Sequence, residues 1–202
     1  MQSSEVLTNV RAPKVARARR LLKRGFRESD GLFLTEGPQA CREAATAGKV
    51  KELFLTQDAF DRYPEIVSAI EASGAEIIVC TEAVIEQFSS TVSPQGMTAV
   101  VRMWDQNPSE LFKSGAKLVV ALTAVRDPGN AGSVIRVADA AGANGVVMSS
   151  DSVDLFNPKV VRSSVGSIFH LPISVGQELA ETISAAREAG MQVLAADANG
   201  VS

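Results

Sequence analysis

The chain has 202 residues, of which 46% are hydrophobic and 21% are charged, a composition that suits one large or two small globular domains. No apolar run approaches the roughly 18 residues that a membrane-spanning helix needs, and the first residues lack the pattern of a secretion signal. Cys41 and Cys80 follow no metal-binding spacing, and His170 is the only histidine. We therefore expect a cytoplasmic protein that binds neither a metal nor a membrane, with His170 as a packed or half-exposed residue.

Basic residues are concentrated at the beginning of the chain. The first 28 residues carry eight basic and two acidic side chains, whereas the remaining 174 carry 12 basic and 21 acidic ones. A basic segment on an acidic body is typical of proteins that bind nucleic acids, and a solvated helix face is the alternative interpretation. The residues of this segment that we predict to contact nucleic acid are Lys14, Arg17, Arg19, Arg20, Lys23, Arg24 and Arg27.

The first 103 residues show alternating helix and strand patterns, punctuated by glycine and proline. The predicted helices cover residues 13–24, 38–47, 64–73 and 82–88. The predicted strands cover residues 32–34, 50–55, 76–80 and 98–103. Glu36 is expected at the beginning of a helix, and the alternation favours a small α/β layer domain. Residues 104–116 are polar and contain Asn107-Pro108 and Gly115, so we predict a linker there.

Residues 117–202 repeat the alternation with longer apolar strands. The predicted strands cover residues 118–125, 146–149, 171–175 and 192–196, and the predicted helices cover residues 131–141, 158–169 and 178–189. Strands that are joined by helical crossovers form a parallel sheet, so the fold class is α/β with a second, parallel-sheet domain.

The segment 118–150 combines a strand, the loop Asp127-Pro128-Gly129-Asn130, a helix and a second strand. Asn130 is a candidate helix cap, and Arg136 is the one basic residue in a helix of small and apolar residues. Open α/β sheets bind ligands at the carboxyl ends of their strands. The loop lacks the G-x-G-x-x-G fingerprint of dinucleotide-binding α/β proteins, which argues against a nucleotide-binding protein of that kind.

This segment resembles the first signature motif of the SpoU (TrmH-type) RNA 2′-O-ribose methyltransferases of the SPOUT superfamily. The matching residues are Asp127, Pro128, Asn130, Gly132, Arg136, Ala138, Ala140 and Gly142. Residues 157–166, followed by Phe169 and Leu171-Pro172, are also similar to the family, and residues 33–37 and 93–96 look like its substrate-binding domain. The resemblance runs from about Val10 to the end. It implies an L30e-like RNA-binding domain in residues 1–103 and a trefoil-knot type methyltransferase domain in residues 117–202.

The resemblance also implies site residues and a methyl donor, S-adenosylmethionine. It gives Arg136 the central catalytic role, with Asn130 beside it; because a guanidinium stays protonated, we expect Arg136 to grip a phosphate and stabilise an alkoxide. Lys159 and Arg162 lie three apart on one predicted helix face, which suits phosphate contact or plain solvation. The residues expected against the donor, mainly through backbone groups, are Leu194, Ala195, Ala196 and Asp197. An ordinary buried strand is the alternative there.

Two later family motifs do not occur before the chain ends at Ser202. We therefore expect a chain that is truncated before the knot and inactive in methyl transfer by itself. The leading functional prediction is methylation of ribosomal RNA by a homodimeric enzyme. A transfer RNA methyltransferase and, for this chain, an RNA-binding module without catalysis are the alternatives.

Overall fold

The computed structural model describes residues 6–89, 91, 93–104, 111–112 and 115–196. Its first sheet contains β1 (Leu32–Glu36), β2 (Val50–Leu55), β3 (Glu76–Val79) and β4 (Met97–Arg102) in the order β1-β4-β2-β3. β4 is antiparallel to β1 and β2, whereas β2 and β3 are parallel. This α/β layer matches the expectation for the first part of the chain.

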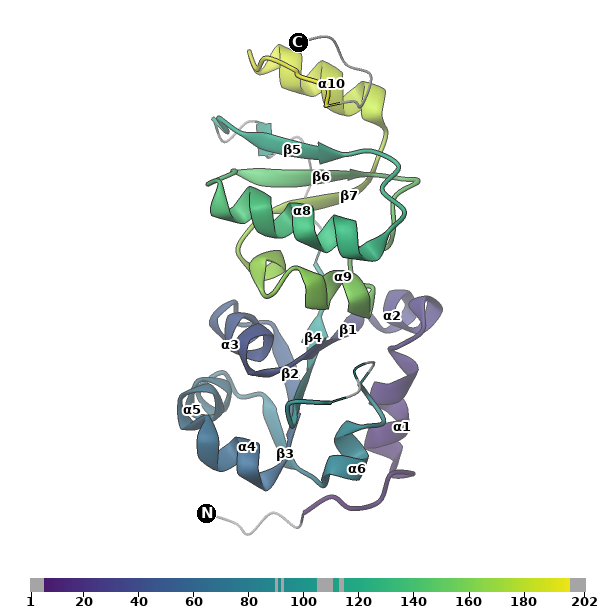
Figure 1. Ribbon diagram of the computed structural model, residues 1–202, viewed down its shortest axis with the longest axis vertical. Coiled ribbons are helices and arrows are strands. Elements are labelled where there is room, and N and C mark those ends of the chain that lie inside the picture. The colour runs from purple at the N-terminus through teal and green to yellow at the C-terminus, as the bar shows by residue number, and fades with distance from the viewer. Residues whose placement is uncertain (1–5, 90, 92, 105–110, 113–114, 197–202) are drawn as a thin grey trace.

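Helices cover both faces of this sheet. Figure 1 shows α3 (Pro38–Thr46), α4 (Gln57–Arg62) and α5 (Pro64–Ala72) on one face, and α1 (Pro13–Arg20) and α6 (Glu82–Ile85) on the other. Each face has its own buried cluster. Cys41 and Ile70 belong to the first, and Val15 and Leu21 belong to the second. α2 (Arg24–Asp30) extends from α1 toward the second sheet.

The second sheet is parallel and contains β5 (Val119–Leu122), β6 (Gly145–Ser149) and β7 (Ile173–Gln177), with β6 in the middle. α8 (Pro128–Ala140) and α9 (Pro158–Ser163) lie between this sheet and the first domain, followed by the short 3-10 helix η1 (Ser167–Phe169). α10 (Leu179–Glu188) lies at the far end of the molecule in Figure 1. The prediction of a parallel sheet with helical crossovers is therefore confirmed.

Aromatic rings join the two sheets into one core. The ring of Phe33, from β1, lies 4.8 Å from that of Phe156 and 6.2 Å from that of Phe169, centroid to centroid. Trp104 completes the group at 5.3 Å from Phe156. Trp104 was predicted to begin a linker, but it is packed here, and Phe112 near the other end of that segment is also buried. Residues 105–110 lie outside the described part of the chain.

Two predicted helices are interrupted. The helix predicted over residues 13–24 is two helices, because Lys23 adopts an extended backbone (φ −99°, ψ 134°) between them. The helix predicted over residues 158–169 breaks where Val165 and Gly166 both have positive φ. Neither break contains a proline, and only the second contains a glycine. The apolar periodicity continues across both breaks, so it predicted one uninterrupted helix in each place.

Other differences concern segment ends. α4 was not predicted; Thr56 begins it by accepting a hydrogen bond from the backbone N–H of Ala59 (3.2 Å). Glu36 ends β1 rather than beginning a helix. The strand predicted over residues 192–196 is wrong: residues 191–196 pair with no strand, and Leu194 is 81% exposed. In the part of the chain that the structure describes, no helix is both long and apolar enough to cross a membrane.

Candidate catalytic site and nucleic-acid interface

The carboxyl edge of the second sheet carries the loop that begins α8. The backbone N–H of Asn130 donates to Asp127 Oδ1 (2.8 Å), so Asp127 caps the helix and the expected capping role of Asn130 is wrong. This backbone donor, assisted by the Lys159 ammonium, holds the pKa of the Asp127 carboxyl below its usual range. Lys159 Nζ lies 3.6 Å from Asp127 Oδ2. The structure thus brings Asn130 and Lys159, predicted separately, to one edge.

Arg136 lies two turns into α8 and faces solvent. Its neighbours Ile135 and Ala138 are buried, whereas Val137 beside it is 63% exposed. Arg136 forms no hydrogen bond or ion pair with any residue that the structure describes. Six helical residues separate it from Asn130, which amounts to about 9 Å along the axis and about 120° around it. Its guanidinium is therefore available to a ligand, but it does not act together with Asn130 by direct contact.

α9 packs closely on α8 at a glycine. A Cβ atom at Gly132 would lie 1.9 Å from Ser163 Oγ and 2.5 Å from the backbone oxygen of Val160. Ser163 Oγ in turn donates to the backbone oxygen of Lys159 (2.8 Å). This contact fixes the height of α9 against α8, and so places Lys159 beside Asp127 and the exposed Arg162 on the same short helix.

The residues predicted to lie against the methyl donor do not form a pocket. Leu194 is largely exposed. It lines a groove of about 130 Å³ together with Phe112 and with Val119, the first residue of β5. Asp197 lies outside the described residues. At the carboxyl edge, a hollow beside Leu122 and Ser149 measures about 10 Å³, and another beside Ser149 and Ser150 measures about 170 Å³. Ligand clefts usually measure roughly 300–1,000 Å³, so the described residues do not fit the donor.

Most cations of the basic segment are paired with carboxylates of the first domain. Arg17 contacts the buried Glu52 (2.7 Å), and Arg20 donates from two nitrogens to Asp30 (3.1 and 2.7 Å). Lys14 pairs with Glu76, and Arg24 pairs with Glu28 at 2.7 Å. The contrast between a basic arm and an acidic body is therefore partly cancelled by direct contacts, and α1 is part of the folded domain.

Arg27 is a structural residue. Its side chain is 3% exposed, pairs with Asp154 of the second domain and donates to the backbone oxygens of Leu21 (2.9 Å) and Leu22 (3.0 Å). This burial leaves no room for a phosphate, so we withdraw the prediction that Arg27 contacts RNA. Arg19 and Lys23 differ from it: both are exposed and form no ion pair with the described residues.

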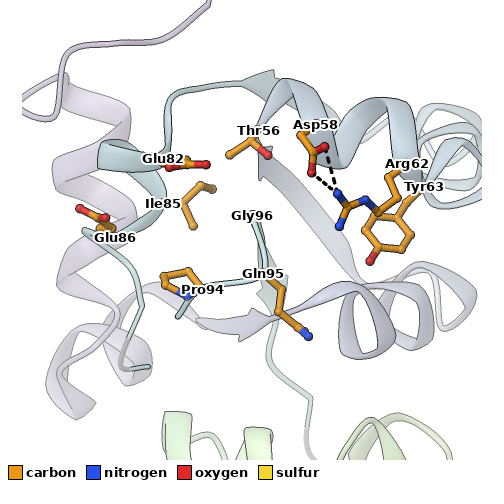
Figure 2. A pocket seen from close by; sticks show the side chains of 10 residues that line it. All are labelled: Thr56, Asp58, Arg62, Tyr63, Glu82, Ile85, Glu86, Pro94, Gln95 and Gly96. Carbon is orange, nitrogen blue, oxygen red and sulfur yellow. Dashed lines mark hydrogen bonds and ion pairs between the residues drawn. The ribbon is translucent and has the colours of Figure 1, made fainter. Parts of the chain in front are cut away.

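A separate cavity of about 290 Å³ lies in the first domain (Figure 2). The motif stretch 93–96 contributes Pro94, Gln95 and Gly96 to its lining. Gln95 also approaches the other motif stretch, because a Cβ at Gly37 would meet Gln95 Oε1 at 2.6 Å, and a Cβ at Gly96 would meet Thr56 Oγ1 at 2.8 Å. Both glycines have positive φ. The residues around the cavity are Thr56, Asp58, Arg62, Tyr63, Glu82, Ile85, Glu86, Pro94, Gln95 and Gly96.

The cavity in Figure 2 was not predicted from the sequence, although the motif stretch that contains Pro94, Gln95 and Gly96 is a signal that could have found it. Asp58 and Arg62 form an ion pair across one wall (2.9 Å), so the charges of Glu82 and Glu86 dominate the remainder. A negative lining repels phosphate, and we do not assign this cavity to RNA backbone binding.

His170 bridges the two domains. Its Nδ1 lies 2.8 Å from Asp139 Oδ2 of α8, and its Nε2 lies 3.0 Å from Glu43 Oε2 of α3. Hydrogen bonding to Glu43, then to Asp139, raises the pKa of the imidazole above its ordinary value. The ring is half-exposed, as expected, and has an interdomain contact that the sequence did not reveal. Within the described residues, no group of three or more His, Cys, Asp or Glu side chains forms a metal site.

Comparison with known proteins gives two matching family models. Residues 117–202 match the SpoU rRNA Methylase family, and residues 12–99 match the MRM3-like substrate binding domain. The chain is 33% identical over 181 residues to the Bacillus subtilis 23S rRNA (guanosine(2553)-2′-O)-methyltransferase RlmP, covering 89% of this chain and 68% of that protein. It is 31% identical to human mitochondrial rRNA methyltransferase 3, over 74% of this chain and 36% of that protein.

Solved structures agree with these matches. An AdoMet-bound rRNA methyltransferase from Sinorhizobium meliloti superposes with a TM-score of 0.80 at 28% identity, over 92% of this chain and 69% of that one. The SpoU methyltransferase AviRb from Streptomyces viridochromogenes, in complex with AdoMet, superposes with a TM-score of 0.74 at 27% identity, over 89% and 69% of the two chains.

Proposed function

Because the chain belongs to the SpoU rRNA methylase family, we propose that it serves an enzyme that transfers the methyl group of S-adenosylmethionine to a ribose 2′-hydroxyl of ribosomal RNA. The observation that carries this proposal is the exposed, unpaired Arg136 on the helix that follows the carboxyl edge of a parallel sheet. The relatives are ribosomal RNA methyltransferases, which favours ribosomal RNA over transfer RNA as the substrate.

Arg136 is proposed to hold the phosphate next to the target ribose. A guanidinium offers a planar pair of donors that matches a phosphate, and its charge stabilises negative charge that develops on the 2′-oxygen. It does not take the hydroxyl proton, because a guanidinium offers only hydrogen-bond donors and no acceptor. Lys159 and Arg162, on the adjacent α9, extend the positive surface for neighbouring phosphates, and Asn130 presents its amide at the same edge.

S-adenosylmethionine is the cofactor that this family uses in the two AdoMet complexes named above. Since the described residues do not enclose a pocket of suitable size, we derive no step through it. We retain Leu194, Ala195, Ala196 and Asp197 as a proposed donor segment on the family resemblance alone. Donor binding requires this segment to leave its exposed position or to gain further neighbours.

RNA binding is proposed for the outer side of the basic segment. Arg19 and Lys23 supply charge without a protein partner, whereas Lys14, Arg17, Arg20 and Arg24 are already paired with carboxylates. Paired cations can still reach phosphates, but each exchange costs a protein ion pair. We therefore assign the strongest phosphate contacts to Arg19 and Lys23 and weaker ones to the other four.

The organisation of the whole protein is also proposed here. We propose residues 1–103 as the RNA-binding part, 104–116 as the connection and 117–202 as part of the methyltransferase domain, supported by matches over residues 12–99 and 117–202. Val137, next to Arg136 in α8, is 63% exposed, and this apolar surface supports a homodimer through this domain. Light scattering at several concentrations tests the dimer. We propose the cytoplasm as its location.

The test of the proposed activity is transfer of tritium from labelled S-adenosylmethionine to ribosomal RNA by the whole enzyme that this chain serves, since we expect no transfer by the chain alone. Arg136→Ala should lower the rate by about 10²–10³-fold, and Arg136→Lys should fail nearly as badly. Arg187→Ala, at an exposed arginine of α10 in the same domain, is the matched control and should leave the rate unchanged. Normal turnover by Arg136→Ala would remove Arg136 from the mechanism. RNA binding without any transfer by the wild type would favour a non-catalytic RNA-binding module.

A further inference from the structure

A groove of about 590 Å³ lies between the segment before α1, the outer face of α1 and the beginning of α2. Its floor is apolar and contains Val10 and Leu22, and its wall holds the ring of Phe26, which is 40% exposed. Most large apolar side chains of this domain are buried, so an exposed phenylalanine in a cleft is unusual. The volume falls within the roughly 300–1,000 Å³ of ligand-binding clefts.

The rim of the groove is positive. Arg11, Arg19 and Lys23 line it, and none of the three forms an ion pair with the residues that the structure describes. Among the residues that the structure describes, no acidic side chain lines the groove. The occupant that fits this charge is an anion, and the occupant that fits the floor is flat and apolar. A nucleotide combines both properties in one molecule.

The ring of Phe26 is held ready for such an occupant. The guanidinium carbon of Arg20 lies 5.3 Å from the centroid of the ring, and Asp30 fixes Arg20 through two hydrogen bonds. Arg20 therefore orients the ring with a cation–π contact instead of serving as a free phosphate ligand. An aromatic ring with one side supported and its remainder exposed is a platform on which an unstacked base can lie.

The groove is close to the catalytic edge. Arg27 of α2 pairs with Asp154, in the segment that follows β6, and Arg24 shares a hollow of about 170 Å³ with Ser150 and Ser152 of that segment. Figure 1 shows α2 beneath the end of the second sheet from which α8 begins. An RNA strand that leaves the catalytic edge therefore reaches the groove across α2.

We propose that this groove binds an unpaired nucleotide of the RNA substrate, with its base on Phe26 and the flanking phosphates on Arg11, Arg19 and Lys23. The proposal rests on the proposed RNA methyltransferase function and names the part of the substrate that this surface selects. A base inside an A-form duplex is stacked on its neighbours and cannot reach the ring, so the groove favours single-stranded segments.

The test compares the binding of a labelled ten-nucleotide single-stranded RNA with that of a duplex of the same length, by fluorescence anisotropy. Phe26→Leu keeps an apolar side chain but removes the ring, and should weaken single-strand binding about five- to tenfold while leaving duplex binding unchanged. Phe26→Tyr should restore it. Tyr63→Leu, at the aromatic residue of the acidic cavity, is the matched control and should have no effect.

Salt dependence separates the ring from the cations. The pair of changes Arg19→Gln and Lys23→Gln should reduce the slope of log K against log salt by about 1.4 for a single strand, whereas Phe26→Leu should leave the slope unaltered. A Phe26→Trp variant should show emission quenched by the bound single strand. Equal binding of Phe26→Leu and wild type, an equal loss for both RNAs, or unquenched Phe26→Trp emission would each overturn the proposal.

Two further outcomes have separate meanings, one for the occupant of the groove and one for the proposed enzyme. Tighter binding of an acidic, tyrosine-containing peptide than of the oligoribonucleotide, lost in Phe26→Leu, would make the groove a protein-docking site and overturn the proposal. Failure of the proposed function has a separate readout. Absence of methyl transfer by the whole wild-type enzyme, together with Phe26-dependent single-strand binding, would refute the enzyme assignment and leave the groove assignment standing.

Discussion

Replacing Gly132 with alanine tests whether the α8–α9 contact sets the position of the catalytic edge. The new Cβ would lie 2.5 Å from the backbone oxygen of Val160, whereas ordinary contacts begin at 3.4 Å, so the two helices must separate by about 0.9 Å. Ser163 can rotate its hydroxyl away from the Cβ, but it then gives up its bond to the backbone oxygen of Lys159. The backbone oxygen cannot rotate away.

The expected size of the effect follows from two opposing contributions. Overpacking costs about 1–3 kcal/mol, and the upper part of that range, about 2–3 kcal/mol, applies here because the overlap is with a backbone oxygen. Against this cost, alanine gains about 1 kcal/mol over glycine in a helix interior. The net loss for Gly132→Ala is about 1–2 kcal/mol, which for a chain of this length lowers the melting temperature by about 2–8 °C. Methyl transfer should fall as well, because Lys159 moves away from Asp127.

Thermal unfolding followed by circular dichroism measures this change. Gly25→Ala is the matched control: Gly25 lies within α2, and its new Cβ meets no heavy atom within 4 Å, so the melting temperature should stay the same or rise slightly. The double change Gly132→Ala with Ser163→Ala removes one overlap and should recover part of the loss. A Gly132→Ala protein that melts at or above the wild-type temperature would refute the reasoning about this contact.

Three other substitutions test two contacts between the domains, at His170 and Arg27, and the helix cap at Asp127. His170→Gln should abolish a pH-dependent contribution to stability. Because the pKa of the imidazole is raised in the folded state, that contribution is full below about pH 6.5 and is lost as the pH rises through the folded pKa. The wild type should therefore lose this stability between pH 6 and 9, and the variant should not. Arg27→Ala should cost about 3–5 kcal/mol in urea unfolding, because Asp154 loses its buried partner; a cost below 1 kcal/mol would contradict the structural role. Asp127→Ala should cost about 1 kcal/mol through loss of the helix cap, and Asp127→Asn should retain most of the stability; equal losses would point to charge instead of capping.

The core of each sheet was predictable because its signal is local. The strand–loop–helix–strand order around Asp127 and Arg136 follows from apolar periodicity, and the structure places its elements within a few residues of the expected ends. The strand expected near Leu194 failed because a strand exists only when another strand pairs with it, and no such partner faces that segment within the described residues.

The site itself was only partly predictable. Arg136 and Lys159 lie on the two helices predicted for them, α8 and α9, but the charge of the basic segment was misjudged. Arg17 is balanced by Glu52, 35 positions away, and Arg27 by Asp154, 127 positions away. Sequence separation of this size carries no local pattern, so a count of cations along the chain could not tell which of them remain available to a phosphate.

The aromatic cluster around Phe33 has a consequence for the exchange of one domain of this protein for an unrelated one. Because Phe33 of the first domain packs against Phe156 and Phe169 of the second, neither half has a closed core when the other is removed. A graft that exchanges the recognition half for an unrelated module would leave Phe156 and Phe169 facing water. A functional chimaera must therefore supply, in its new recognition half, a surface that packs on Phe156 and Phe169 as Phe33 does. The two halves of this chain, produced as separate polypeptides, should associate through these rings.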